Sequence, residues 1–199
     1  YGFLFLYSFY SNEVAKLFKW VICIAGTFAT IVSLFFITTL EYPMDMGEGS
    51  LVLRDSTATV VAYGEGMDKE LLVNGVGIAR LTPIVKMMAH LPLSIRKNKP
   101  ESALIIALGM GTTLRPAASW GIDVKCVELV PSVVKAFPYY FKDASSIINQ
   151  PNVEVIVDDG RRFLNRTQSK YDVITIDPPP PIETAGTSLL YSREFYEIL

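Results

Sequence analysis

The chain has 199 residues, of which 50% are hydrophobic, with a formal net charge of −2 and a mean hydropathy of +0.33. This length allows one domain with an attached segment, and such a high hydropathy indicates a membrane part. The near-neutral charge argues against a nucleic-acid-binding surface. The two cysteines, Cys23 and Cys126, match neither a zinc pattern nor a disulfide framework, and we expect both to be small buried residues.

Residues 1–40 are predicted to be transmembrane segments. Residues 1–10 are almost entirely aromatic or aliphatic, which is typical of the end of a membrane helix. Residues 21–40 form a run of twenty residues without a charge, with Trp20 and Tyr42 beside its two ends. A helix of this length spans about 30 Å of hydrocarbon, and aromatic residues favour the membrane interface. The sequence therefore predicts an integral membrane protein in contact with membrane lipid.

The orientation of the membrane segment has two conflicting indications. Lys16 and Lys19 precede the apolar run, whereas Glu41 and Asp45 follow it, and this charge pattern favours a globular part outside the cytoplasm. A binding site for a cytosolic metabolite, described below, favours the opposite side. We give the site more weight and predict a cytoplasmic globular domain.

Residues 41–50 read as a linker, and residues 51–101 as a small β-sheet subdomain with a helix. Three short β-rich runs, at 50–54, 57–63 and 70–75, predict an antiparallel sheet. Residues 84–91 predict a short helix with Thr82 as its cap and Pro83 at its first position. His90, near the end of that helix, is expected to be a packing or capping residue rather than a ligand.

Residues 102–199 predict a Rossmann-like α/β domain that binds a nucleoside. The apolar run at 103–108 is typical of a buried parallel strand, and Gly109 and Gly111 follow it. Glu128 lies nineteen residues after Gly109, at the end of the second predicted strand, where an acid typically accepts hydrogen bonds from ribose hydroxyls. Leu114 replaces the third glycine of the dinucleotide fingerprint. S-adenosylmethionine therefore fits this pattern at least as well as NAD.

Two more acids follow predicted strands. The strands at 153–157 and 171–176 lead into Asp159 and Asp177, and a helix is predicted at 132–143. Since ligands of open α/β sheets bind outside the carboxyl ends of the strands, we expect Glu128, Asp159 and Asp177 to converge on one site. The sequence ends within the helix expected after Asp177, so we expect a fold that is truncated at its C-terminus.

The order of these motifs resembles the spermidine synthase (polyamine aminopropyltransferase) family, and the membrane segment resembles its membrane-fused branch. The resemblance covers about residues 51–199. The segments that carry it are LVNG (72–75), AHLPL (89–93), LIIALGMGTTLR (104–115), VKCVELVPSVV (124–134), VEVIVDDGRRFL (153–164), YDVITID (171–177) and LYSREFYEIL (190–199).

The resemblance implies a role for each matching residue. Gly109 and Gly111 match the glycines of the nucleoside loop. Glu128 matches the acid that binds the ribose, and Asp159 matches the acid that reads the adenine amino group. Asp177 matches the first aspartate of the active-site loop and is the candidate catalytic base. Their neighbours Met110, Leu129 and Gly160 complete the expected donor-binding set. The resemblance also implies S-adenosylmethionine or its decarboxylated form as substrate, no metal, and a possible homodimer.

The sequence departs from the family at three places that bear on the second substrate. Met110 stands where the family has an aspartate that grips the aminopropyl ammonium, and Pro180 stands where the active-site loop has a second aspartate. The segment 77–88 lacks the tyrosine and carboxylates that hold the polyamine. Asp177 is then the remaining candidate base toward an attacking amine.

Four functions remain open at this point. The first is aminopropyl transfer to an amine with release of methylthioadenosine. The second is a lyase or cyclase reaction within S-adenosylmethionine itself. The third is methyl transfer to an amino group, because Asp177 with the prolines after it resembles the Asp-Pro-Pro motif of amino-group methyltransferases. The fourth is a nucleoside sensor or membrane partner protein without catalysis.

Overall fold

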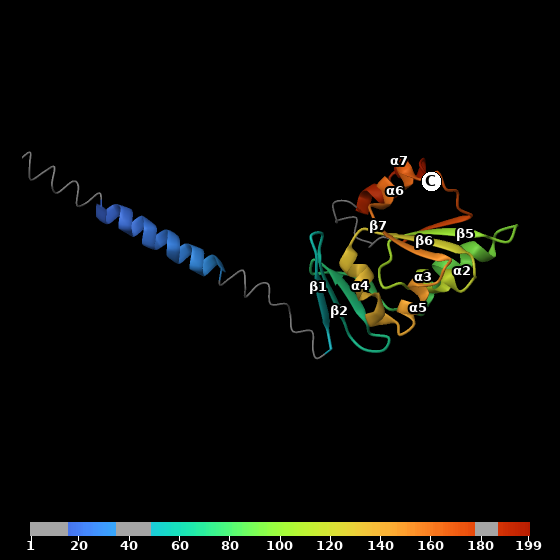
Figure 1. Ribbon diagram of the computed structural model, residues 1–199, viewed down its shortest axis with the longest axis horizontal. Helices are drawn as coiled ribbons and strands as arrows, with labels where there is room; N and C mark the ends of the chain where they lie inside the picture. Colours follow the sequence, from blue (N-terminus) through green and yellow to red (C-terminus); the bar gives the residue numbers. More distant parts are fainter. Residues whose placement is uncertain (1–15, 35–48, 178–186) are drawn as a thin grey trace, which may run out of the picture. The chain divides into compact units, whose positions relative to one another are not determined.

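The computed structural model describes residues 16–34, 49–177 and 187–199, and it divides into two compact units, Tyr1–Met46 and Gly47–Leu199 (Figure 1). In the first unit, one helix, Lys16–Leu34, is long and apolar enough to cross a membrane, although a signal sequence near an N-terminus has the same length and composition. Cys23 is exposed on this helix, contrary to the prediction that it is buried. Residues 1–15, the end of the predicted span and most of the predicted linker lie outside the described residues.

The second unit begins with a four-stranded antiparallel sheet in chain order, formed by β1 (Leu51–Arg54), β2 (Thr59–Tyr63), β3 (Glu70–Val73) and β4 (Val76–Arg80). The three predicted runs correspond to β1, β2 and β3. The fourth strand was not predicted. Asn74 and Gly75 form the turn before it, with φ of 52° and 78°. Asn-Gly between two apolar runs is a strong hairpin signal, because both turn positions need positive φ.

The predicted helix after this sheet begins as a 3-10 turn, η1 (Pro83–Lys86), and continues as α2 (Met87–Ser94). Thr82 is the N-cap residue and Pro83 lies in the first turn, as predicted, although the described Thr82 side chain makes no capping hydrogen bond. His90 is a packing residue as expected, since its Nδ1 accepts a hydrogen bond of 3.0 Å from Nε1 of Trp120.

A four-stranded parallel sheet follows, formed by β5 (Ser102–Ile106), β6 (Asp123–Glu128), β7 (Val153–Val157) and β8 (Val173–Ile176), in the order β7-β6-β5-β8. The first strand in the chain, β5, is therefore central, with the next two strands on one side and β8 on the other. This is the strand order of a Rossmann-like fold, and its switch point lies beside the end of β5. The fold positions a ligand site there.

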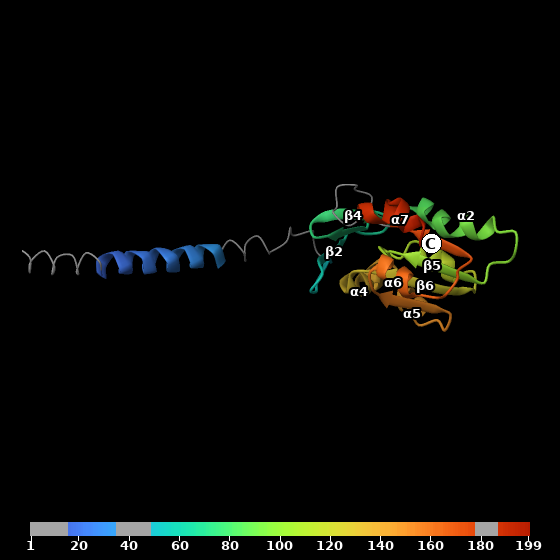
Figure 2. The same ribbon diagram turned by 90° about the horizontal axis from the view of Figure 1, so that it is seen from above.

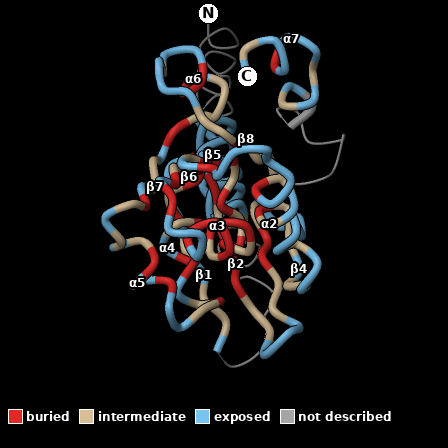
Figure 3. The backbone as a smooth tube through the Cα atoms, turned by 90° about the vertical axis from the view of Figure 1, so that its right-hand side faces the viewer, coloured by how far each residue is buried: buried red, intermediate tan, exposed pale blue. Residues whose placement is uncertain are grey.

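Helices cover both faces of the parallel sheet (Figures 1 and 2). On one face lie α2, α3 (Leu114–Ala118), α4 (Pro131–Tyr140) and α5 (Ala144–Ile148); on the other lie α6 (Gly160–Arg166), η2 (Thr187–Tyr191) and α7 (Arg193–Tyr196). Alternate residues of β5 enter the two cores, Ile105 the first and Ile106 the second. The buried stretches of chain run through β5, β6 and the helices beside them (Figure 3). Cys126 of β6 is buried as predicted.

The small sheet packs on α4, which lies between it and the parallel sheet (Figure 1). Oδ2 of Asp55 accepts a hydrogen bond of 2.7 Å from the amide of Ser132 in the first turn of α4. Nζ of Lys69 donates to the carbonyl of Tyr139 at 2.7 Å near the other end of that helix. A hydrogen bond from the Ser132 side chain, with amide bonds from Thr57, Ala58 and Ser132 itself, outweighs burial and holds the pKa of Asp55 well below its usual range. Both ends of α4 are thus tied to the small sheet.

Candidate functional site

The loop after β5, residues 107–113, is built from unusual backbone conformations. Gly109 has a φ of 53° and Gly111 a φ of 79°, and Ala107 has a φ of 75° although it carries a Cβ. The left-handed conformation costs a residue with a Cβ roughly 1–2 kcal/mol. The amide of Ala107 donates to the carbonyl of Val127 at 2.9 Å, which holds the loop to β6 at the point of strain. The surrounding structure therefore holds Ala107 in a backbone conformation that the residue does not favour by itself.

The two glycines are required for different reasons. A Cβ on Gly111 would lie 2.0 Å from Cε2 of Phe137, a fully buried residue of α4. A Cβ on Gly109 would meet nothing within 4 Å. Gly111 thus allows α4 to pack against the loop, whereas at Gly109 the backbone remains open to the edge of the sheet.

Glu128, at the end of β6, is buried and holds the glycine loop in place. Its Oε2 accepts hydrogen bonds from the amide of Leu108 at 2.8 Å and of Gly109 at 3.4 Å, and its Oε1 accepts from the amide of Val130 at 2.9 Å. Burial raises the pKa of the Glu128 carboxyl, and the amides of Val130 and Leu108 oppose that rise. A carboxylate offers about four acceptor positions, so a ribose hydroxyl could still donate to it.

Asp177, directly after β8, lies on the other side of the same loop. Its amide donates to the carbonyl of Ile106 at 2.9 Å, and its Oδ2 accepts a hydrogen bond of 3.1 Å from Oγ1 of Thr113. Burial raises the pKa of the Asp177 carboxyl, and the bond from Thr113 partly offsets the rise. Asp177 is thus a half-buried carboxyl with increased proton affinity, positioned at the switch point of the sheet.

The two successive acids after β7 are used within the protein. Asp159 is the N-cap of α6, with Oδ1 accepting from the amide of Arg162 at 2.8 Å. Asp158 is buried and pairs with both Arg162 and Arg166. Burial opposes ionisation of Asp158, but the hydrogen bonds from Arg162 and the amide of Asp159 outweigh it and lower its pKa. The structure therefore gives Asp159 a capping role beside its predicted contact with adenine.

The neighbours of these acids differ in exposure. Leu129, after Glu128, is 54% exposed, and Val157, which pairs with Glu128 across β6 and β7, is 50% exposed. Both are exposed apolar side chains at the ends of adjacent strands. Gly160 allows close packing, because a Cβ there would lie 2.6 Å from Cγ2 of Ile106.

Met110 lies in the core. Its side chain is 1% exposed and belongs to the same buried cluster as Leu108 and Leu114. The sequence comparison with the family had placed Met110 near the donor's charged tail. The structure instead directs this side chain inward, so the residue between the two glycines contributes apolar packing.

The structure therefore brings Glu128 and Asp177 to opposite sides of one loop, with Gly109 and Leu129 beside them. Sequence reasoning missed Thr113, whose hydroxyl bonds Asp177, and Asp158, whose ion pairs hold α6. Thr113 could have been noticed two residues after the second glycine, but its partner depends on the path of β8.

Within residues 16–34, 49–177 and 187–199, no group of three or more His, Cys, Asp or Glu side chains is arranged to hold a metal ion. The predicted departure at Pro180 lies outside the described residues.

Comparison with known families and curated proteins gives a consistent assignment. A family model described as the spermine/spermidine synthase domain matches residues 83–199. A polyamine aminopropyltransferase of Thermococcus kodakarensis is 32% identical over 165 residues, which cover 79% of this chain and 51% of the relative. One from Methanocaldococcus jannaschii is 33% identical over 114 residues, covering 56% of this chain and 38% of the relative. The chain thus spans about half of the length of the first relative and less of the second.

Solved structures show the same fold. A spermidine synthase in complex with the transition-state analogue AdoDATO matches with a TM-score of 0.63 and 24% identity, over 74% of this chain and 52% of that one. Spermidine synthase from Thermotoga maritima matches with a TM-score of 0.61 and 23% identity, over 74% and 51%.

The unequal surroundings of the two glycines give a testable prediction. Gly111→Ala should destabilise the protein by about 3 kcal/mol or more, because the left-handed backbone and the overlap with Phe137 both contribute. Gly109→Ala, the matched control, should cost only about 1–2 kcal/mol, since its backbone is left-handed but its surroundings are open. Denaturant unfolding of both variants measures the difference. Equal losses would contradict the packing role of Gly111.

Proposed function

Because the chain belongs to the spermine/spermidine synthase domain family, we propose that it is an aminopropyltransferase-like enzyme that uses decarboxylated S-adenosylmethionine. The observation that carries this proposal is the position of Asp177, a half-buried carboxyl hydrogen-bonded to Thr113 of the glycine loop, at the strand edge shared with Glu128. A proton acceptor and a nucleoside loop adjoin there. This is the arrangement that alkyl transfer from a sulfonium to an amine requires.

The donor's nucleoside is proposed to lie across the ends of β5, β6 and β7. Gly109 lets the backbone approach the nucleoside, and Gly111 keeps the same loop packed on α4. Glu128 accepts a hydrogen bond from the ribose, and the exposed Leu129 packs against the base. Asp159 and Gly160 lie at the end of this proposed site beside β7. A similarly folded spermidine synthase has been solved in complex with the transition-state analogue AdoDATO.

In the proposed reaction, a neutral amine attacks the methylene carbon beside the sulfonium. A carbon–nitrogen bond forms, the carbon–sulfur bond breaks with its electrons moving to sulfur, and methylthioadenosine leaves. The proton lost by the amine passes to Asp177. An alkylamine with a pKa of about 10 is almost wholly protonated at neutral pH, so a positioned base matters. Such bases typically contribute about 10²–10⁴ in rate. Burial, which raises the pKa of Asp177, increases its affinity for this proton.

One observation favours a second candidate. The glycine loop presents the buried Met110 in place of a carboxylate, so its side chains offer no counter-charge for the ammonium of a decarboxylated donor. A zwitterionic tail, as in S-adenosylmethionine itself, needs less compensation. Elimination or cyclisation within that tail would also release methylthioadenosine, without an acceptor.

We also infer that helix Lys16–Leu34 anchors the enzyme in a membrane, with the globular part on the cytoplasmic side. The helix has the required length and apolar composition, and its side chains are largely exposed in the structure. Exposed apolar side chains along a whole helix are stable in lipid. Membrane lipid is the proposed partner, and the acceptor would be a small molecule available in the cytoplasm.

The donor and acceptor can be identified together. We would incubate the full chain in a non-ionic detergent with S-adenosylmethionine or its decarboxylated form, with and without putrescine, and follow methylthioadenosine by mass spectrometry. Release that needs both the decarboxylated donor and the amine supports aminopropyl transfer. Release from S-adenosylmethionine alone supports the second candidate, and S-adenosylhomocysteine would indicate methyl transfer. Nucleoside binding without any product would contradict all three reactions.

Asp177→Asn tests the proposed base. Turnover should fall by roughly 10²–10⁴, because the amide cannot accept the proton, while binding of methylthioadenosine should change by less than about threefold. Asp123→Asn, at the opposite end of the parallel sheet, is the control and should keep full activity. Turnover that survives in the Asp177 variant would show that another group is the base.

Thr113→Val tests the hydrogen bond to Asp177 through the pH profile. The hydroxyl favours the ionised carboxylate, so its removal should raise the pKa of Asp177 further. The base is active only when ionised. The acidic limb of kcat/KM should therefore move to higher pH in this variant, and Thr113→Ser should restore its position. A limb that stays in place or moves to lower pH would contradict the assignment.

A further inference from the structure

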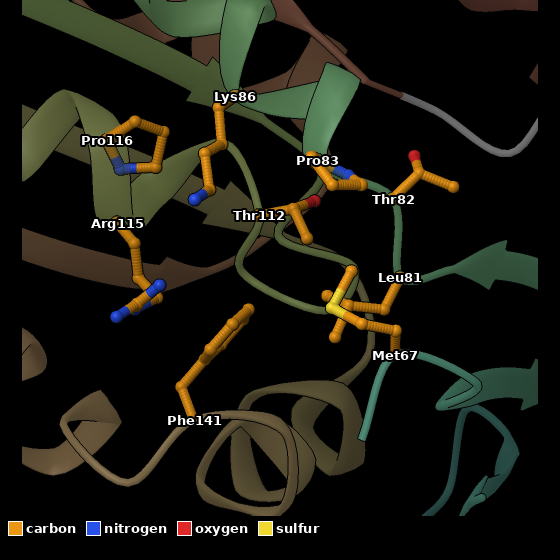
Figure 4. A pocket seen from close by; sticks show the side chains of 9 residues that line it. All are labelled: Met67, Leu81, Thr82, Pro83, Lys86, Thr112, Arg115, Pro116 and Phe141. Carbon is orange, nitrogen blue, oxygen red and sulfur yellow. The ribbon is translucent and has the colours of Figure 1, made fainter. Parts of the chain in front are cut away.

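A hollow lies beside the glycine loop, between α3, the end of α4, the β2–β3 loop and the segment that leads from β4 into η1 (Figure 4). Its cavity volume is about 130 Å³. Since roughly 10–15 Å³ is enough for one water, the cavity has room for a small organic molecule. The lining residues are Met67, Leu81, Thr82, Pro83, Lys86, Thr112, Arg115, Pro116 and Phe141. The set shares no member with the predicted donor-binding residues.

The lining combines an apolar wall with positive charge. Met67, Leu81 and Phe141 supply aliphatic and aromatic surface, whereas Lys86 and Arg115 supply two cations. In Figure 4 the tips of the two cationic side chains lie on one side of the hollow, and Met67 and Leu81 lie on the other. The described lining contains no carboxylate. Its polarity is therefore divided between an apolar end and a cationic end.

The two cations are not equivalent. Nε and Nη2 of Arg115 donate to Asp143 at 3.0 and 2.6 Å, and its guanidinium lies 4.1 Å from the centre of the Phe141 ring. Arg115 is thus fixed in place and largely neutralised. Lys86 is exposed, and among the described residues its ammonium has no ion-pair partner. The uncompensated positive charge at this end of the hollow belongs to Lys86.

We propose that this hollow binds a small organic carboxylate that has a compact apolar body. The carboxylate contacts the Lys86 ammonium and the Arg115 edge, and the body packs among Phe141, Met67 and Leu81. A cationic molecule of the same shape meets two like charges, and a neutral one leaves the Lys86 charge without a partner. The proposal does not depend on the reaction carried out at Asp177.

Benzoate is a suitable probe, with benzamide and benzylamine as neutral and cationic molecules of the same shape. The full chain in a non-ionic detergent would carry labelled methionine methyl groups, and NMR titration would follow them. Met67 lines the hollow, whereas Met110 lies in the core. Benzoate should shift the Met67 signal and bind about fivefold or more tightly than either analogue, as expected for one partly exposed charge pair.

Lys86→Gln should remove the preference for benzoate over benzamide, while Lys135→Gln should leave it unchanged. Both lysines are exposed, and Lys135 of α4 is absent from the lining, so neither change should alter folding. The proposal is overturned if benzoate does not shift Met67, if all three probes bind equally, or if the preference survives in the Lys86 variant.

Discussion

The buried carboxylate of Glu128 fixes the geometry of the whole ligand-facing edge. Its three hydrogen bonds join the loop after β5 to the turn after β6, so two segments twenty residues apart share one anchor. Leaving a buried amide unpaired costs roughly 1–3 kcal/mol, so loss of this side chain would release the loop and the start of α4 together. The residue proposed to bind the ribose therefore also shapes the surface on which the nucleoside would lie. Burial, which raises the pKa of Glu128, opposes ionisation of this carboxyl, and the amide bonds offset that effect in part.

Much of this edge could be predicted from local patterns. The strand predicted at 153–157 coincides with β7, and the positions of Glu128 and Asp177 follow from strand ends, because parallel strands end on the same side. The roles of Asp158 and Asp159 could not be predicted in this way. One of these acids caps α6 and the other forms ion pairs with Arg162 and Arg166. The assignment depends on where that helix begins. Likewise, the direction of the Met110 side chain depends on the positive φ angles around it, which the sequence does not specify for Ala107.

The glycine loop separates two electrostatic environments. At the strand edge, the loop donates hydrogen bonds to Glu128 and Asp177. On the side of α3, its Thr112 lines the hollow that also contains Lys86 and Arg115. Adjacent regions of opposite charge sort small ligands by sign as well as by shape. The acidic edge lies within the segment that matches the spermine/spermidine synthase domain, and it is where we propose that the donor binds. The cationic hollow is a separate property of this chain, built from residues of the small sheet's connections and of α3 and α4.

The bond between Asp55 and the amide of Ser132 joins residues 77 apart in the chain. Together with the Lys69 contact, it makes α4 a shared element of both sheets, so we expect the two sheets to unfold together. Cooperativity of this kind depends on contacts that are distant in sequence, which also slow folding because the loops between them must close first. The antiparallel sheet and the parallel sheet therefore differ in topology but lie in the same compact unit, Gly47–Leu199.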